Sequence, residues 1–152
     1  MADLLAGLSQ DEARQLRALG SHRSLAGGAR LFQLGERAEH LFLVERGRIK
    51  LTLPMRIRDR DEEVLVEERG PGQTVGWSAL IPPYRFTLTG IALLETDVLA
   101  LSREALGAHF AAFPAVGYAV SLNLAAVIGQ RLQVFQAMWL REVERTVELH
   151  CA

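Results

Sequence analysis

The chain has 152 residues, of which 49% are hydrophobic and 23% charged, so it is long enough for one domain with a buried core but short for a two-domain enzyme. Its 17 Lys and Arg against 18 Asp and Glu leave a net charge of -1, which disfavours a free-standing nucleic-acid-binding or membrane-surface protein. A single cysteine, Cys151, excludes an intramolecular disulfide framework and a multi-cysteine zinc site, and it fits a reducing compartment.

A helix is predicted near the start of the chain, within residues 4–22. Ser9 is a favourable cap residue, and Glu12, three residues later, can reach back to the cap amide. The first residues do not combine a basic segment with a following apolar segment, so the sequence does not predict a secretory signal. We expect a cytoplasmic protein.

Residues 23–101 predict an antiparallel β-roll. Short runs rich in Leu, Val, Ile, Phe and Thr are separated there by glycine-bearing turns, which is typical of a sandwich or barrel. The runs at 41–44 and 49–53 predict two strands that are joined across residues 45–48. Residues 56–63 mix both signs of charge, and this indicates a solvent-exposed hairpin tip.

The end of the chain is predicted to be helical, with a short helix and turn at residues 102–114 and a long helix at 116–148. Residues 110–130 lack charged side chains, but their Gly, Ser, Asn and Pro content favours a buried helix over a membrane span. At about 1.5 Å per residue the long helix would measure roughly 50 Å, too much for a small roll to cover. The predicted fold is α+β, in a single domain over residues 1–152.

The long helix carries an apolar seam that one roll cannot bury. Its side chains recur at spacings of four and three, and they are Leu124, Ile128, Leu132, Phe135, Trp139 and Val143. Four further apolar residues widen this surface, namely Val127, Val134, Met138 and Leu140. The seam predicts a symmetric homodimer in which the helix pairs with its twin. The alternative is a monomer with the helix folded back on the roll.

The order of elements resembles the cyclic-nucleotide-binding domain of the catabolite-activator and oxygen-response regulator (Crp/Fnr) family. The motifs that carry the resemblance are GARLFQLGE at 28–36, LFLV at 41–44, GRIKL at 47–51, GPGQTVG at 70–76 and RLQV at 131–134. The likeness covers nearly all of residues 4–148. It implies a cupin-like, double-stranded jelly roll flanked by an N-terminal helix and a long C-terminal dimerisation helix.

The resemblance also implies a partner for signal transduction. Full-length regulators of that family continue past the dimer helix into a helix-turn-helix domain, whereas this chain stops at Ala152. We therefore expect no DNA binding by this chain, and a downstream protein that receives its signal. A truncated transcription regulator is a weaker alternative.

A phosphate-binding cassette is implied at residues 76–89. In the family an arginine pairs with the cyclic phosphate, amides at a helix start hold the anion, and a glutamate accepts a hydrogen bond from the ribose. The ligand-binding residues implied here are Gly76, Trp77, Ser78, Ala79, Leu80, Arg85, Phe86 and Thr87, with Phe135 and Gln136 of the long helix near the base. Cyclic AMP or cyclic GMP is thus a candidate ligand, among other small anions.

Two residues depart from the cassette pattern. Trp77 stands where the family has its glutamate, and loss of a charged acceptor costs about 1.5–3 kcal/mol, or about ten- to a hundredfold in affinity. Phe86 replaces a small residue. The aromatic side chains of Trp77, Tyr84 and Phe86 either line a ligand cavity or fill it. Arg85 binds an anion or pairs with a carboxylate of the chain itself.

The sequence lacks the motifs of an enzyme. Its four histidines, His22, His40, His109 and His150, are isolated from one another, so no metal site is predicted. It also has neither a nucleophile elbow nor a phosphate-cradling glycine loop with a lysine. We predict a ligand-sensing regulatory module. The alternative is a protein-interaction or accessory subunit with an aromatic-filled, ligand-free pocket.

Overall fold

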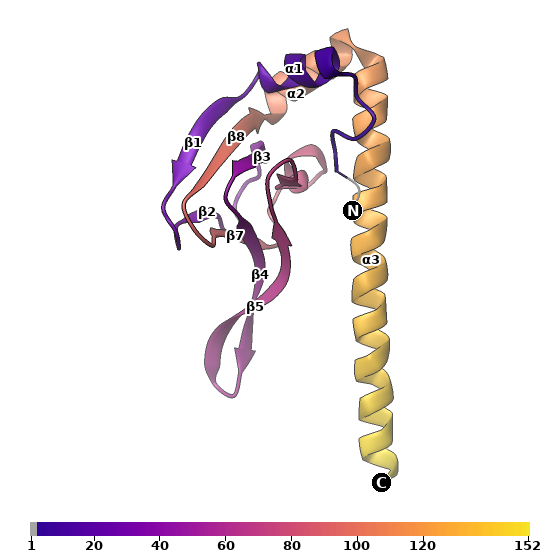
Figure 1. The fold of residues 1–152 in the computed structure, drawn as a ribbon. Helices are drawn as coiled ribbons and strands as arrows, with labels where there is room; N and C mark the ends of the chain where they lie inside the picture. Colours follow the sequence, from indigo (N-terminus) through magenta and orange to yellow (C-terminus); the bar gives the residue numbers. More distant parts are fainter. Residues whose placement is uncertain (1–2) are drawn as a thin grey trace.

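A computed structural model describes residues 3–152, and Figure 1 shows their arrangement. In chain order the elements are α1 (Gln10–Arg17), β1 (Ser21–Leu25), β2 (Arg30–Phe32), β3 (His40–Arg46), β4 (Ile49–Ile57), β5 (Arg60–Arg69), β6 (Thr74–Val75), the 3-10 helix η1 (Trp77–Leu80), β7 (Thr89–Ala92), β8 (Thr96–Ser102), α2 (Arg103–Ala112) and α3 (Pro114–Cys151).

Two antiparallel sheets form the roll. One has the strand order β1-β8-β3-β6 and the other β2-β7-β4-β5. Their strands lie within residues 21–102, close to the predicted limits of 23–101. The predicted α+β class, with an antiparallel roll between an N-terminal helix and a long C-terminal helix, is confirmed (Figure 1).

Strands β3 and β8 are buried on both faces, which explains their unbroken apolar runs. In β3, Phe42 and Val44 point into the roll, whereas Leu41 and Leu43 point outwards to the helices. Strand β8 alternates in the same way between the two sides. The molecule therefore has two cores, one inside the roll and one between the roll and the helices.

The N-terminal helix is shorter than the prediction of 4–22, since α1 spans only Gln10–Arg17. Ser9 caps it as expected, accepting a hydrogen bond from the amide of Glu12 at 3.1 Å. The preceding segment is bonded to α3 instead, because the side-chain Nδ2 of Asn123 donates to the carbonyl oxygens of Leu4 at 3.0 Å and Ala6 at 2.7 Å. These tertiary bonds hold the segment in a turn where the sequence favoured a helix.

The short helix α2 lies within the predicted residues 102–114, whereas α3 extends beyond its predicted boundaries. Pro114 lies in the first turn of α3, where its missing N–H and fixed φ are tolerated, so that helix begins two residues before the prediction of 116 and ends three after 148. Only the first part of α3 is buried, through Val116, Val120 and Leu124. Leu124 and Ile128, which the sequence assigned to the dimer seam, therefore pack within their own chain. None of the helices within residues 3–152 combines the length and apolarity needed to cross a membrane.

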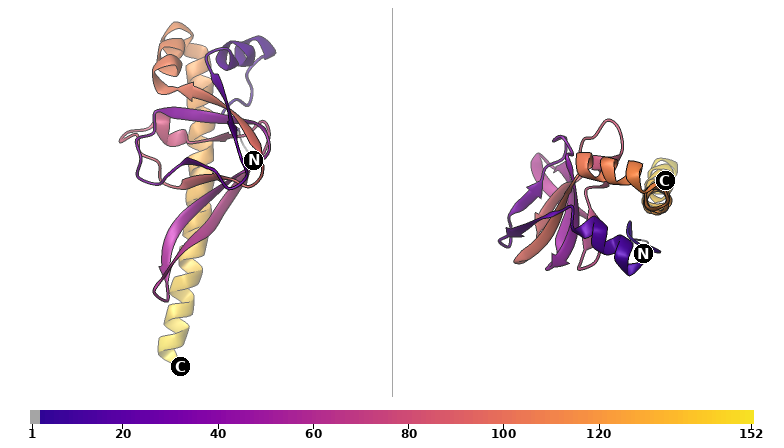
Figure 2. Two further views of the ribbon diagram at one scale, coloured as in Figure 1. Left: turned by 90° about the vertical axis from the view of Figure 1, so that its left-hand side faces the viewer. Right: turned by 90° about the horizontal axis from the view of Figure 1, so that it is seen from above.

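The hairpin of β4 and β5 extends beyond the roll. It turns at Arg58 and Asp59, which have φ angles of 49° and 63°, and residues 56–63 are exposed as predicted. Figure 2 shows that the hairpin runs in the same direction as the second half of α3. The C-terminal end of α3 projects beyond the roll (Figure 2).

The turn between β3 and β4 depends on Gly47. Its φ is 90°, and an added Cβ would lie 2.6 Å from the carbonyl oxygen of Glu95 and 2.7 Å from the Cα atom of Thr96. Gly35 has a similar φ of 91° but open space around the same position. An added side chain would meet backbone strain at both glycines but steric overlap only at Gly47.

We predict that Gly47→Ala lowers the free energy of unfolding by about 3 kcal/mol, combining a left-handed penalty of about 1–2 kcal/mol with overpacking of about 1–3 kcal/mol. Gly35→Ala should show only the first of these losses. Urea denaturation of both variants measures the difference. Equal losses would contradict the steric account of Gly47.

Candidate functional site

The cassette begins at a sharp turn after β6. Gly76 has a φ of 83°, in the left-handed region, and η1 follows directly. Within η1, Ala79 is fully buried in the roll core, whereas Trp77 and Leu80 are half-buried and pack against the core on the helix side. This single turn contacts both cores of the molecule.

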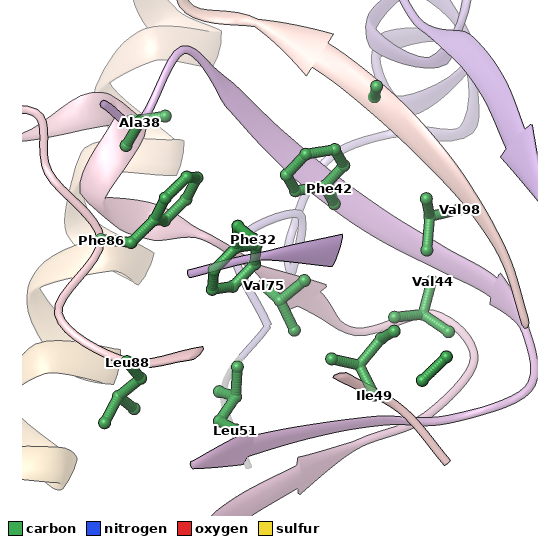
Figure 3. Close-up of a cluster of buried hydrophobic side chains, with 13 residues drawn as sticks. Phe32, Ala38, Phe42, Val44, Ile49, Leu51, Val75, Phe86, Leu88 and Val98 are labelled. Atoms are coloured by element: carbon green, nitrogen blue, oxygen red, sulfur yellow. The ribbon is translucent and has the colours of Figure 1, made fainter. Parts of the chain in front are cut away.

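Aromatic rings fill the roll beside the cassette (Figure 3). The side chain of Phe86 is 6% exposed and stacks on Phe32, with ring centroids 4.0 Å apart and an interplanar angle of 13°. The Phe32 ring also stacks on Phe42 at 6.0 Å. Stacked rings of this kind add to the stabilisation from their burial.

A small cavity lies between the cassette and the filled roll. Its volume is about 20 Å³, and its lining includes five of the predicted ligand-binding residues: Gly76, Trp77, Ser78, Phe86 and Thr87. One water molecule needs about 10–15 Å³ on this measure, whereas ligand pockets measure about 300–1,000 Å³. In this conformation the cavity accommodates a water molecule and no nucleotide.

Arg85 lies outside this cavity. The residue is exposed, it forms a backbone bridge to Arg37, and its guanidinium donates a hydrogen bond to the carbonyl oxygen of Gly35 at 2.9 Å. A neutral backbone group therefore holds the side chain in place of the carboxylate considered from the sequence. The positive charge of Arg85 is not neutralised by that contact.

The two predicted base-contacting residues of α3 also lie away from the cassette. Phe135 lines a larger cavity, of about 250 Å³, between α3 and the hairpin, and Gln136 is exposed on the helix. One turn earlier, Arg131 lines the small cavity and reaches over Trp77, with its guanidinium carbon 5.5 Å from the ring centroid. Arg131 thus contacts the cassette where the two predicted residues do not.

A cluster of three charged residues joins β5 to α3. The carboxylate of Glu67 lies 2.6 Å from a guanidinium nitrogen of Arg131 and 3.1 Å from one of Arg69. The side chain of Arg69 is only 3% exposed, and the other two are largely buried. Ion pairs in such surroundings are screened little by solvent, and removal of one partner leaves a buried charge.

Burial affects the ionisation of this region. It lowers the pKa of the Arg69 guanidinium, while the nearby Glu67 carboxylate acts in the opposite direction. Burial likewise raises the pKa of the Asp3 carboxyl group, which the Leu4 amide and the positive charge of Arg69 partly oppose. An arginine remains charged at neutral pH despite such a shift, so the cluster holds two positive groups around one carboxylate.

Sequence reasoning did not identify Glu67 and Arg69 as site residues. Their spacing of two places both on one face of β5, which is the only local signal, and charged residues at such spacing usually face solvent. Their partner Arg131 is 62 positions beyond Arg69 in the chain. Within residues 3–152, no group of three or more His, Cys, Asp or Glu side chains is placed to hold a metal ion.

Most of the roll matches a known protein family. Residues 22–112 match the family described as the cyclic nucleotide-binding domain. The chain is also 28% identical over 130 residues to the cyclic AMP receptor protein of Thermus thermophilus. That match covers 86% of this chain and 57% of the relative, so this chain spans little more than half of that protein.

Solved structures agree with this assignment. The N-terminal domain of a transcriptional regulator from Streptomyces coelicolor A3(2) is 30% identical with a TM-score of 0.72, over 87% of this chain and 90% of that one. The Thermus thermophilus catabolite activator protein is 26% identical with a TM-score of 0.75, over 90% of this chain and 61% of that one. The family match spans more than half of the residues and runs from the first strand of the roll through α2. The chain therefore belongs to the cyclic nucleotide-binding domain family.

Proposed function

We propose that the chain is a homodimeric regulatory module that binds a small anionic molecule and transmits this binding through α3. The observation that carries the proposal is the exposed seam of α3, at Leu132, Phe135, Trp139 and Val143. A contiguous apolar stripe on a projecting helix is typical of an interaction surface, and its spacing suits a second helix. Pairing of two copies through α3 buries this stripe symmetrically.

The contacts of α3 make it suitable for transmission. Asn123 fixes the helix to the N-terminal segment, and Arg131 connects it to both Glu67 of β5 and Trp77 of the cassette. Beyond Arg131 the helix residues are exposed. A ligand that binds more tightly to one arrangement of roll and helix would shift the population towards that arrangement, and the paired helices would carry the change.

The charge of Arg85 supports the anionic ligand. Its guanidinium is exposed and, among residues 3–152, is held only by a backbone carbonyl, so it is available for a phosphate or carboxylate group. Cyclic AMP and cyclic GMP are candidates because this chain belongs to a family described by cyclic nucleotide binding and is similar to a cyclic AMP receptor protein. Such a module regulates other proteins and needs no catalytic residue of its own.

A specific observation favours the second candidate function, a protein-interaction or accessory subunit without a small ligand. The roll is filled beside the cassette, since Phe86 stacks on Phe32 and the remaining cavity is about 20 Å³. In this role the roll is a rigid support and the exposed surfaces of the dimer bind another protein. Ligand titration separates the two functions.

We predict that Trp139→Glu converts the dimer to a monomer, because a buried charge in the seam opposes helix pairing. Leu140→Glu is the matched control, since both residues are exposed in one copy, at 66% and 54%, but Leu140 lies off the seam. Sedimentation velocity measures both masses. A monomeric parent chain, or equal dissociation by both variants, would overturn the proposed pairing.

The ligand site is tested by calorimetric titration with cyclic AMP, cyclic GMP, other nucleotides and small organic anions. We expect saturable binding that Arg85→Ala weakens by about ten- to a hundredfold, the loss typical of a charged hydrogen bond. Arg37→Ala should retain binding, because Arg37 is an exposed arginine directly across the backbone bridge. Lack of binding across the whole panel would favour the interaction subunit instead.

We further predict that Glu67→Gln detaches α3 from the roll. It leaves Arg69 and Arg131 without their shared counter-charge and should lower the free energy of unfolding by about 3–5 kcal/mol. Glu62→Gln, at an exposed position of β5, should change it by less than about 0.5 kcal/mol. Hydrogen exchange should quicken in α3 around Arg131, and equal effects of the two variants would argue against the ion cluster as a coupling element.

A further inference from the structure

A second cavity with a mostly apolar lining lies outside the cassette. This hairpin cavity, of about 250 Å³, is lined by residues of β4, β5 and α3. Figure 1 shows the two strands on one side and the helix on the other. Its apolar lining includes Leu53 and Val66 from the hairpin and Val127, Val134, Phe135 and Met138 from the helix. A hydrocarbon body would replace water there at little cost.

One end of the hairpin cavity is charged. Glu67, Arg69 and Arg131 line it, and their two guanidinium groups exceed the one carboxylate by a single positive charge. In this cluster the buried Nε atom of Arg69 has no hydrogen-bond partner among residues 3–152, and the same holds for the buried Oε1 atom of Glu67. The nearby Asp3 carboxyl accepts from the Leu4 amide and the Thr74 hydroxyl instead. An unpaired buried donor in a lining that holds two guanidinium groups and one carboxylate indicates a place for an acceptor.

We propose that the hairpin cavity binds a small amphipathic carboxylate, with its apolar body between the hairpin and α3 and its carboxylate on Arg69 and Arg131. A cavity of about 150 Å³ accepts benzene, so the hairpin cavity admits a body of about eight to ten carbons. The lining suits hydrocarbon better than a purine or sugar, whose polar groups need partners when buried. The inference rests on the proposed function, because it names the ligand class of the regulatory module.

The position of the hairpin cavity on α3 is compatible with dimer formation. Val127, Val134 and Met138 line the cavity, whereas the exposed seam that begins at Leu132 lies about a third of a turn around the helix. Phe135 borders both surfaces. A twin helix on the seam therefore leaves the hairpin-facing side of α3 for the small molecule.

Binding at this position would act on the contact that holds α3. Glu67 and the ligand carboxylate would share the same two arginines, so the ligand weakens the bond between Glu67 and Arg131 that joins β5 to the helix. Its apolar body would in turn contact both sides of the cavity. Ligand affinity is thus linked to the position of the helix, as regulation requires.

The test is calorimetric titration of the full chain with decanoate and with its neutral isostere decanamide. We expect saturable decanoate binding that is at least tenfold tighter than that of decanamide. Val134→Trp fills the cavity and should abolish binding, and Met138→Trp provides a second variant in the same wall. Leu140→Trp is the matched control, because Leu140 is about as exposed as Val134, at 54% and 57%, but lies away from the cavity.

Three results would overturn the inference: equal binding of decanoate and decanamide, decanoate binding that survives both tryptophan variants of the cavity, or its loss in Arg85→Ala but not in Val134→Trp. No binding of decanoate by a dimer that binds a cyclic nucleotide at Arg85 would overturn it as well and leave the proposed function intact. Sedimentation of the same samples distinguishes failure of this inference from failure of the proposed function, since a monomeric chain would overturn the proposed function by itself.

Discussion

Double-sided burial of β3 and β8 is the constraint on which the rest of the structure depends. Each strand contributes alternate side chains to the roll interior and to the layer beneath the helices, as Phe42 and Leu43 do in β3. A strand that belongs to two cores cannot shift for one without disturbing the other, because protein interiors are close-packed. The helices are therefore mechanically part of the roll, and the cassette turn η1, which contacts both cores, lies where the two meet.

Electrostatic contacts complete this arrangement over the second half of the domain. The apolar packing of α3 ends near Val127, and from there the Glu67 cluster and the stacking of Arg131 over Trp77 hold the helix beside β5. Apolar contacts are non-directional and tolerate small rearrangements, whereas a bridging carboxylate requires particular positions of both arginines. The transition from one kind of contact to the other divides α3 into an anchored half and a projecting half.

Local patterns in the sequence were sufficient to predict most of the fold. Alternating and continuous apolar runs indicated strands such as those at 41–44 and 49–53, and helical spacing predicted α3, because these features depend on neighbouring residues. The N-terminal helix was overestimated, since distant bonds from Asn123 decide the conformation near Leu4. The cluster of Glu67, Arg69 and Arg131 was not predictable for the same reason: its members meet only after folding. The family motif located the cassette, but whether its aromatic residues fill the roll depends on tertiary packing.

Phe86 and Arg85 are adjacent in an extended segment, so their side chains point to opposite sides of it. With the phenylalanine inside the roll, the arginine has to be outside, and a one-residue change of register would exchange them. The two side chains therefore compete for the same interior. Any anion drawn inside the roll by Arg85 must first displace a stacked aromatic ring. Its apparent affinity is then the intrinsic affinity multiplied by the fraction of molecules in which that ring is displaced. If the proposed anion enters the roll, the size of residue 86 would therefore set the concentration at which it binds.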